Sequence, residues 1–87
     1  MPAYIVSYDL IKDKNYKRLT DELLRLDAHK ALLSVWLVNL NNTAKEVRDH
    51  LRGFMDDDDK IIVAEITSNS CAWKAFTGTQ DWLDANT

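Results

Sequence analysis

The sequence predicts an α+β fold in which an antiparallel sheet carries two helices on one face and a short helical segment follows at the C-terminus. Two segments, residues 4–10 and 61–66, are apolar on both alternating faces, which is typical of strands that are covered on both sides. Two other segments have apolar residues three and four positions apart, as in helices that bury one side. The expected order is strand, helix, one or two strands, helix and strand. Right-handed crossovers turn this order into a ferredoxin-like sandwich.

The first strand ends in an acidic residue. Alternation places Ile5, Ser7 and Asp9 on one face of the strand and an apolar set on the other, namely Tyr4, Val6 and Tyr8. A strand rarely tolerates an ionised carboxylate that has no partner. Asp9 is therefore the first candidate functional residue.

The segment between the two outer strands predicts a helix, a strand region and a second helix. Asp13 is the expected cap of the first helix, and Thr43 with Glu46 has the spacing of a capping box at the start of the second. Residues 28–40 are rich in Leu, Val and Trp without Pro or Gly, which predicts one bent strand or two short ones. The expected buried stripes are Tyr16, Leu19, Leu23 and Leu26 in the first helix and Ala44, Val47, Leu51 and Phe54 in the second.

Four adjacent aspartates, residues 56–59, connect the second helix to the last strand. They lack the alternating spacing and the glycine of a calcium loop, so we expect a solvated turn at this place.

The C-terminal residues are too apolar for a free tail, since they include Trp73, Phe76, Trp82 and Leu83. We expect a ferredoxin-like core domain at residues 1–67 and a C-terminal aromatic segment at residues 68–87, packed on the core or on a partner subunit. Two helices can cover only one face of the sheet, so the other face needs a cover as well. A homodimer through that open face is the simplest cover, and the C-terminal segment is the competing one.

Length and composition limit the class of protein. The chain has 87 residues, enough for one domain, and a formal charge of −3, which argues against broad nonspecific adhesion to nucleic acid. Its single cysteine, Cys71, cannot form an intrachain disulfide, which fits a cytoplasmic location. The longest apolar stretch, residues 31–38, is shorter than the roughly 20 residues of a membrane span, and the N-terminus lacks the pattern of a secretion signal. We therefore expect no membrane association.

The order of short motifs resembles that of the CRISPR-associated Cas2 family, small dimeric ferredoxin-like proteins of the spacer-acquisition machinery. Residues 4–10 look like that family's first strand with its terminal aspartate, and Ser34-Val35-Trp36 is similar to its Ser-Val-aromatic strand. Residues 39–46 resemble the polar turn into its second helix, and residues 60–66 its fourth strand. The layout is also similar to VapD-type ribonucleases and the GhoS-type endoribonuclease antitoxin. The resemblance implies that Asp9 occupies the position where a pair of aspartates, one from each subunit, binds a divalent metal.

The residues around Asp9 are compatible with that chemistry. Mg²⁺ needs only one or two carboxylates in addition to phosphates and water, so two copies of Asp9 could hold it, and the Ser7 hydroxyl could orient a bound water. A basic cluster follows at the expected start of the first helix, a position suited to phosphate, and it consists of Lys12, Lys14, Lys17 and Arg18. The resemblance, together with these residue types, leads us to expect a Mg²⁺-dependent endonuclease that acts on DNA or RNA.

A purely structural interpretation stays open beside this one. Asp9 could cap the turn into the first helix, and Lys17–Asp21 and Arg18–Glu22 could be ordinary ion pairs four residues apart. The protein would then be a noncatalytic dimeric adaptor, or an antitoxin-like module, that binds another protein through its C-terminal aromatic segment.

Other candidate residues give weaker signals. His29 and His50 have no serine or cysteine placed for a catalytic triad, so we expect them to face solvent. Cys71 is expected to be a buried or half-buried thiol. Trp36, Trp73 and Trp82 could stack on bases, although packing in the core or at an interface is the more common use of tryptophan.

Overall fold

A computed structural model describes residues 1–9 and 17–87 and confirms the α+β class. The described elements are β1 (Ala3–Asp9), α1 (Lys17–Arg25), β2 (His29–Leu32), β3 (Val35–Asn39), α2 (Ala44–Arg52), β4 (Lys60–Ile66) and α3 (Thr79–Asn86). The strands form one sheet in the order β2-β3-β1-β4, and each neighbouring pair is antiparallel. Strand β1, which ends in Asp9, is therefore an interior strand of a ferredoxin-like sheet.

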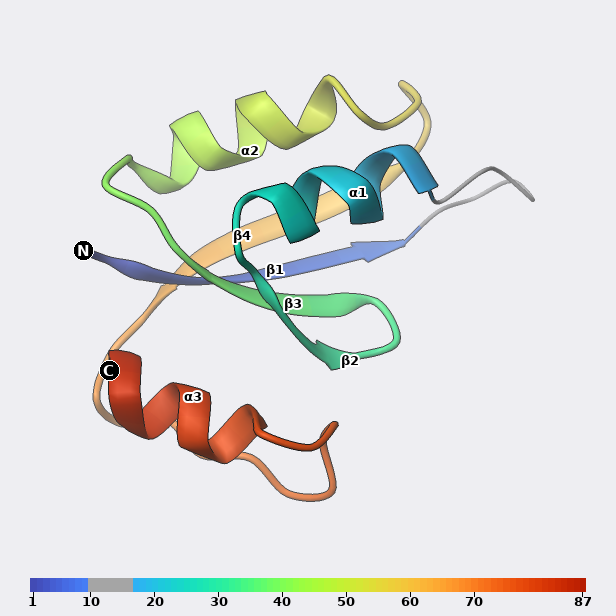
Figure 1. Ribbon diagram of the computed structural model, residues 1–87. Helices are drawn as coiled ribbons and strands as arrows, with labels where there is room; N and C mark the ends of the chain where they lie inside the picture. Colours follow the sequence, from blue (N-terminus) through green and yellow to red (C-terminus); the bar gives the residue numbers. More distant parts are fainter. Residues whose placement is uncertain (10–16) are drawn as a thin grey trace.

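Helices α1 and α2 lie side by side on one face of the sheet, and α3 lies on the other (Figure 1). The main core fills the layer between the sheet and α1 and α2, because the apolar face of each strand meets the apolar stripe of each helix. From the strands it takes Tyr4, Val6, Tyr8, Trp36 and Val38, and from the helices Leu19, Leu23, Val47 and Leu51. None of the helices in the described ranges is long and apolar enough to cross a bilayer.

The structure decides between the two alternatives for residues 28–40 and confirms the predicted start of α2. Residues 28–40 form two short strands, the second of the two expected alternatives, joined at Leu33 and Ser34. The Thr43 hydroxyl accepts from the Glu46 N–H at 3.1 Å, and the Glu46 carboxylate accepts from the Thr43 N–H at 2.8 Å, so the capping box is formed. The expected cap Asp13 and the stripe residue Tyr16 lie outside the described residues.

The C-terminal residues fold back onto the sheet. Leu83 of α3 packs against Ala31 of β2 and Leu37 of β3 in a second, smaller core on the face that α1 and α2 leave open. At the far end of α3, the Asn39 side chain donates to the Asn86 side chain. The C-terminal segment therefore covers the part of this face that lies over β2 and β3.

Candidate functional site

Asp9 is the last residue of β1 and its side chain is exposed. Within β1, Ala3, Ile5, Ser7 and Asp9 share one face by alternation, and the core side chains Tyr4, Val6 and Tyr8 share the other. Asp9 therefore lies on the face opposite to α1 and α2.

The described residues around Asp9 combine one charge of each sign with apolar side chains. Lys60 is opposite Asp9 in the antiparallel pair of β1 and β4, and Ile62 is opposite Ser7. Residues of these two strand ends line an open pocket of about 550 Å³: Ser7, Tyr8, Asp9, Lys60, Ile61 and Ile62. Ile62 is 70% exposed, so α3 leaves this end of the face uncovered.

The structure brings Ser7 and Asp9 together on one face, and among the described residues that line the open pocket Asp9 is the only carboxylate. Ser7 is half-buried and lies two residues before Asp9, so its hydroxyl is on the same side of the strand. Among the described residues, no group of three or more Asp, Glu, His or Cys could hold a metal ion. A divalent cation at Asp9 would need further oxygen ligands from a second copy of the chain or from a nucleic-acid phosphate.

Two of the four predicted phosphate-binding cations lie in the described residues, and both have protein partners. The Lys17 ammonium is 2.6 Å from the Asp21 carboxylate, which confirms the expected pair four residues apart. The Arg18 guanidinium donates to the Gly53 carbonyl at 3.0 Å and links α1 to the end of α2. Both side chains remain exposed, so each can still reach a phosphate. Lys12 and Lys14 lie outside the described residues.

The expected Arg18–Glu22 pair is wrong. Glu22 is 5% exposed and instead accepts two hydrogen bonds from the Arg25 guanidinium, at 2.7 and 2.6 Å. The same carboxylate is 2.5 Å from the His50 ring of α2. The hydrogen bonds from Arg25 and then from His50 lower the pKa of Glu22 to about 2. This cluster ties α1 to α2 on the helical layer, away from Asp9.

Two of the predictions about weaker candidates, those for His29 and Cys71, need correction. His29 is half-buried and its Nε2 lies 2.9 Å from the Thr79 hydroxyl, so it anchors α3 rather than facing solvent. The expected exposure of His50 is confirmed, and its ring is also bonded to the Glu22 carboxylate. Cys71 is exposed, not buried, because the segment that carries it crosses the sheet face at the surface. The prediction for Trp36 is confirmed, since it is 3% exposed in the main core and donates to the Tyr8 hydroxyl at 3.2 Å.

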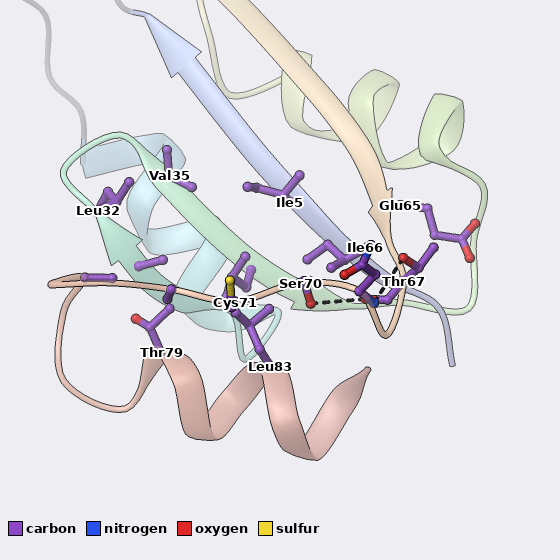
Figure 2. Close-up of a pocket in the computed structure, with 15 residues that line it drawn as sticks. Ile5, Leu32, Val35, Glu65, Ile66, Thr67, Ser70, Cys71, Thr79 and Leu83 are labelled. Carbon is purple, nitrogen blue, oxygen red and sulfur yellow. Dashed lines mark hydrogen bonds between the residues drawn. The ribbon is translucent and has the colours of Figure 1, made fainter.

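One feature is not evident from the sequence. An apolar pocket of about 350 Å³ lies between the sheet and the C-terminal segment, and Ile5, Ile66, Cys71 and Leu83 are among its lining residues (Figure 2). It forms where the segment bridges from β4 to α3 without filling the space over β1. No local pattern predicts this pocket, because it depends on where residues 67–78 cross the sheet.

Comparison with known proteins gives a family for the chain. A family model described as CRISPR associated protein Cas2 matches residues 1–72, which include β1 to β4 and the first part of the C-terminal segment. No solved structure matches the chain.

Proposed function

Since this chain belongs to the CRISPR-associated Cas2 family, we propose that it acts on nucleic acid in the cytoplasm as a homodimer and is a Mg²⁺-dependent endonuclease. One observation carries the proposal. Asp9 ends an interior strand, is exposed, and lies on the end of the sheet face that none of the described helices covers. A carboxylate in that position is accessible both to a phosphate and to a second copy of the chain.

The proposed dimer uses the uncovered end of this face. Ile5 is 36% exposed and Ile62 is 70% exposed, and both lie on the same side of the sheet as Asp9. A second copy packed there would remove apolar surface from water, which stabilises the pair by roughly 25 cal/mol for each Å² buried. Such a pair, related by a twofold axis, can place one Asp9 carboxylate near the other, and the repulsion between them favours a shared divalent cation.

The chain's own residues have separate roles in this proposal. Asp9 of each copy would hold the cation, and the Ser7 hydroxyl would orient a water molecule toward the scissile phosphate. Lys12, Lys14, Lys17 and Arg18 would bind flanking phosphates. When bound, Mg²⁺ supplies Lewis-acid polarisation of a phosphoryl oxygen and lowers the pKa of a bound water.

Asp9→Asn tests the catalytic proposal. We expect labelled DNA and RNA to be cleaved in Mg²⁺ and not in EDTA, and we expect the variant to lose at least about 100-fold in rate because it loses the metal's carboxylate. Asp57→Asn, in the exposed turn before β4, is the matched control and should cleave at the unchanged rate. Circular dichroism checks that both variants fold. Cleavage that persists in EDTA, or is equal in Asp9→Asn and the parent protein, contradicts the proposal.

The second candidate is a noncatalytic dimeric adaptor, and the lysine opposite Asp9 favours it. Lys60 can neutralise the Asp9 carboxylate without a metal, since the two are register partners at the strand ends. An adaptor should cleave neither DNA nor RNA, and its binding to a partner protein should not change in Asp9→Asn. Size-exclusion chromatography with light scattering of the parent protein and of Ile62→Lys tests the dimer that both candidates need.

A further inference from the structure

The loop between β4 and α3 presents aromatic side chains to solvent. We call residues 72–78 the aromatic loop; it contains Trp73, which is 85% exposed, and Phe76, which is 43% exposed. Exposed apolar surface of this kind, when it is rimmed by polar residues, is typical of an interaction site. Trp73 takes no part in either apolar core of the described structure.

A lysine ammonium lies over each of these rings. Lys74 is 5.9 Å from the centre of the Trp73 ring, and Lys30 of β2 is 5.8 Å from the centre of the Phe76 ring. Among the ion pairs of the described residues, neither lysine has a carboxylate partner. From residue 67 to residue 80 the chain has no acidic residue, and Lys74 is its only charge. The surface therefore combines aromatic faces with unneutralised positive charge, on a protein whose net charge is −3.

The aromatic loop is held in place at both ends. The Phe76 N–H donates to the Ala31 carbonyl of β2 at 2.9 Å, and the Ala72 N–H donates to the Gln80 side chain at 2.8 Å. The Thr79 hydroxyl donates to the Phe76 carbonyl at 2.7 Å, so its oxygen accepts from His29 Nε2. A loop fixed in this way loses little conformational freedom when a ligand stacks on it.

We propose that the aromatic loop is a stacking platform for single-stranded nucleic acid, with Trp73 and Phe76 contacting bases and Lys30 and Lys74 contacting phosphates. Only unpaired bases have free faces for an aromatic ring, so the ligand is single-stranded rather than duplex. A surface with lysines beside the aromatic rings and no acidic residues between them favours a polyanionic ligand over a protein of ordinary surface charge. α3 and the aromatic loop lie on the side of the sheet opposite to α1 and α2, as Asp9 does (Figure 1). The inference rests on the nucleic-acid part of the proposed function and does not require cleavage.

Binding of two fluorescent oligonucleotides in EDTA tests the platform. One is an oligothymidylate of about 20 nucleotides and the other is an abasic strand of the same length, which has the phosphates without the bases. We expect the protein to prefer the oligothymidylate. In Trp73→Ala the affinity for oligothymidylate should fall roughly 5- to 100-fold, and the preference for oligothymidylate over the abasic strand should disappear. Trp73→Phe keeps an aromatic ring, so it should retain most of the affinity and most of the preference. Lys74→Ala should weaken binding of the two strands equally and reduce the salt dependence.

Matched controls separate this inference from the catalytic proposal. Leu24→Ala removes a side chain that is 62% exposed on α1 and should leave binding unchanged. Because binding is measured in EDTA, where no metal-dependent cleavage takes place, a failure of the catalytic proposal leaves this test unaffected. Equal binding by Trp73→Ala and the parent protein overturns the platform, and so does an equal affinity of the parent protein for the abasic strand. A protein partner that is lost in Trp73→Ala while oligothymidylate binding stays unchanged overturns it as well.

Discussion

Glu22 shows how a single buried carboxylate can hold two helices together. Glu22 lies on the inner side of α1, where its carboxylate accepts two hydrogen bonds from the Arg25 guanidinium of the same helix. The carboxylate also contacts the His50 ring of α2. Burial alone would raise the pKa of Glu22, but the hydrogen bonds outweigh burial and lower the pKa to about 2. The ionised form is therefore the one that the folded state favours.

The lowered pKa of Glu22 predicts an acid-dependent loss of stability. Its contribution is fully present above the ordinary carboxyl pKa of 4.5 and is lost as the pH falls toward about 2. We expect the free energy of unfolding in urea to fall over this range, and to fall less steeply in Glu22→Gln. Asp49, whose pKa is lowered to about 2 by Lys45 and then by Arg48, titrates in the same window. Asp49→Asn is therefore the necessary comparison. Equal slopes for Glu22→Gln and the parent protein would contradict this role of Glu22.

Among the helices, α2 shows most clearly how local sequence sets an element's boundary. The reciprocal hydrogen bonds of Thr43 and Glu46 satisfy two N–H groups that the first turn of a helix leaves without partners. The helix ends at Arg52, and the next residue, Gly53, donates to the carbonyls of the last turn. Both boundaries follow from residues within or next to the element.

Removal of the cap should weaken α2 by a measurable amount. Thr43→Ala deletes the hydroxyl that accepts from Glu46, and we expect a loss of about 1 kcal/mol in the free energy of unfolding. Thr43→Ser keeps the hydroxyl and should cost less. Urea denaturation followed by circular dichroism measures both changes. A loss of the same size in Thr43→Ser and Thr43→Ala would show that the methyl group, and not the hydrogen bond, matters.

At the scale of the whole molecule, the sheet separates two apolar layers of different size. The main core lies under α1 and α2, and the smaller core lies under α3 around Ala31, Leu37 and Leu83. The described residues of α3 have few neighbours outside β2, β3 and its own preceding loop. We therefore expect α3 to detach at a lower cost than global unfolding.

Two leucine substitutions distinguish the layers. Leu51 is fully buried in the main core, so Leu51→Ala should reduce the free energy of global unfolding by about 2–5 kcal/mol. Leu83 is 5% exposed in the smaller core, and Leu83→Ala should mainly release α3. Limited proteolysis should then cut Leu83→Ala between residues 67 and 78 while the rest of the chain stays protected. General proteolysis of Leu83→Ala throughout the chain would show that the two layers unfold together.

Local sequence patterns predicted the alternation of β1, the capping box, the burial of Trp36 and the order of the elements, with one or two strands at residues 28–40. These features depend on neighbours within a few positions, where the periodicities of helices and strands and the chemistry of caps apply directly. Asp9 could be grouped with Ile5 and Ser7 on one face for the same reason, since alternation along one strand needs no knowledge of the rest of the fold.

The tertiary structure alone decided which partners the polar side chains meet. Glu22 meets Arg25 and His50 instead of Arg18, and His29 meets Thr79 fifty positions away, because the packing of whole elements brings these residues together. The exposure of Cys71 and Trp73 depends likewise on the path of the C-terminal segment across the sheet. Contacts between elements have no periodic signature in the chain, since they arise only when apolar faces select their partners.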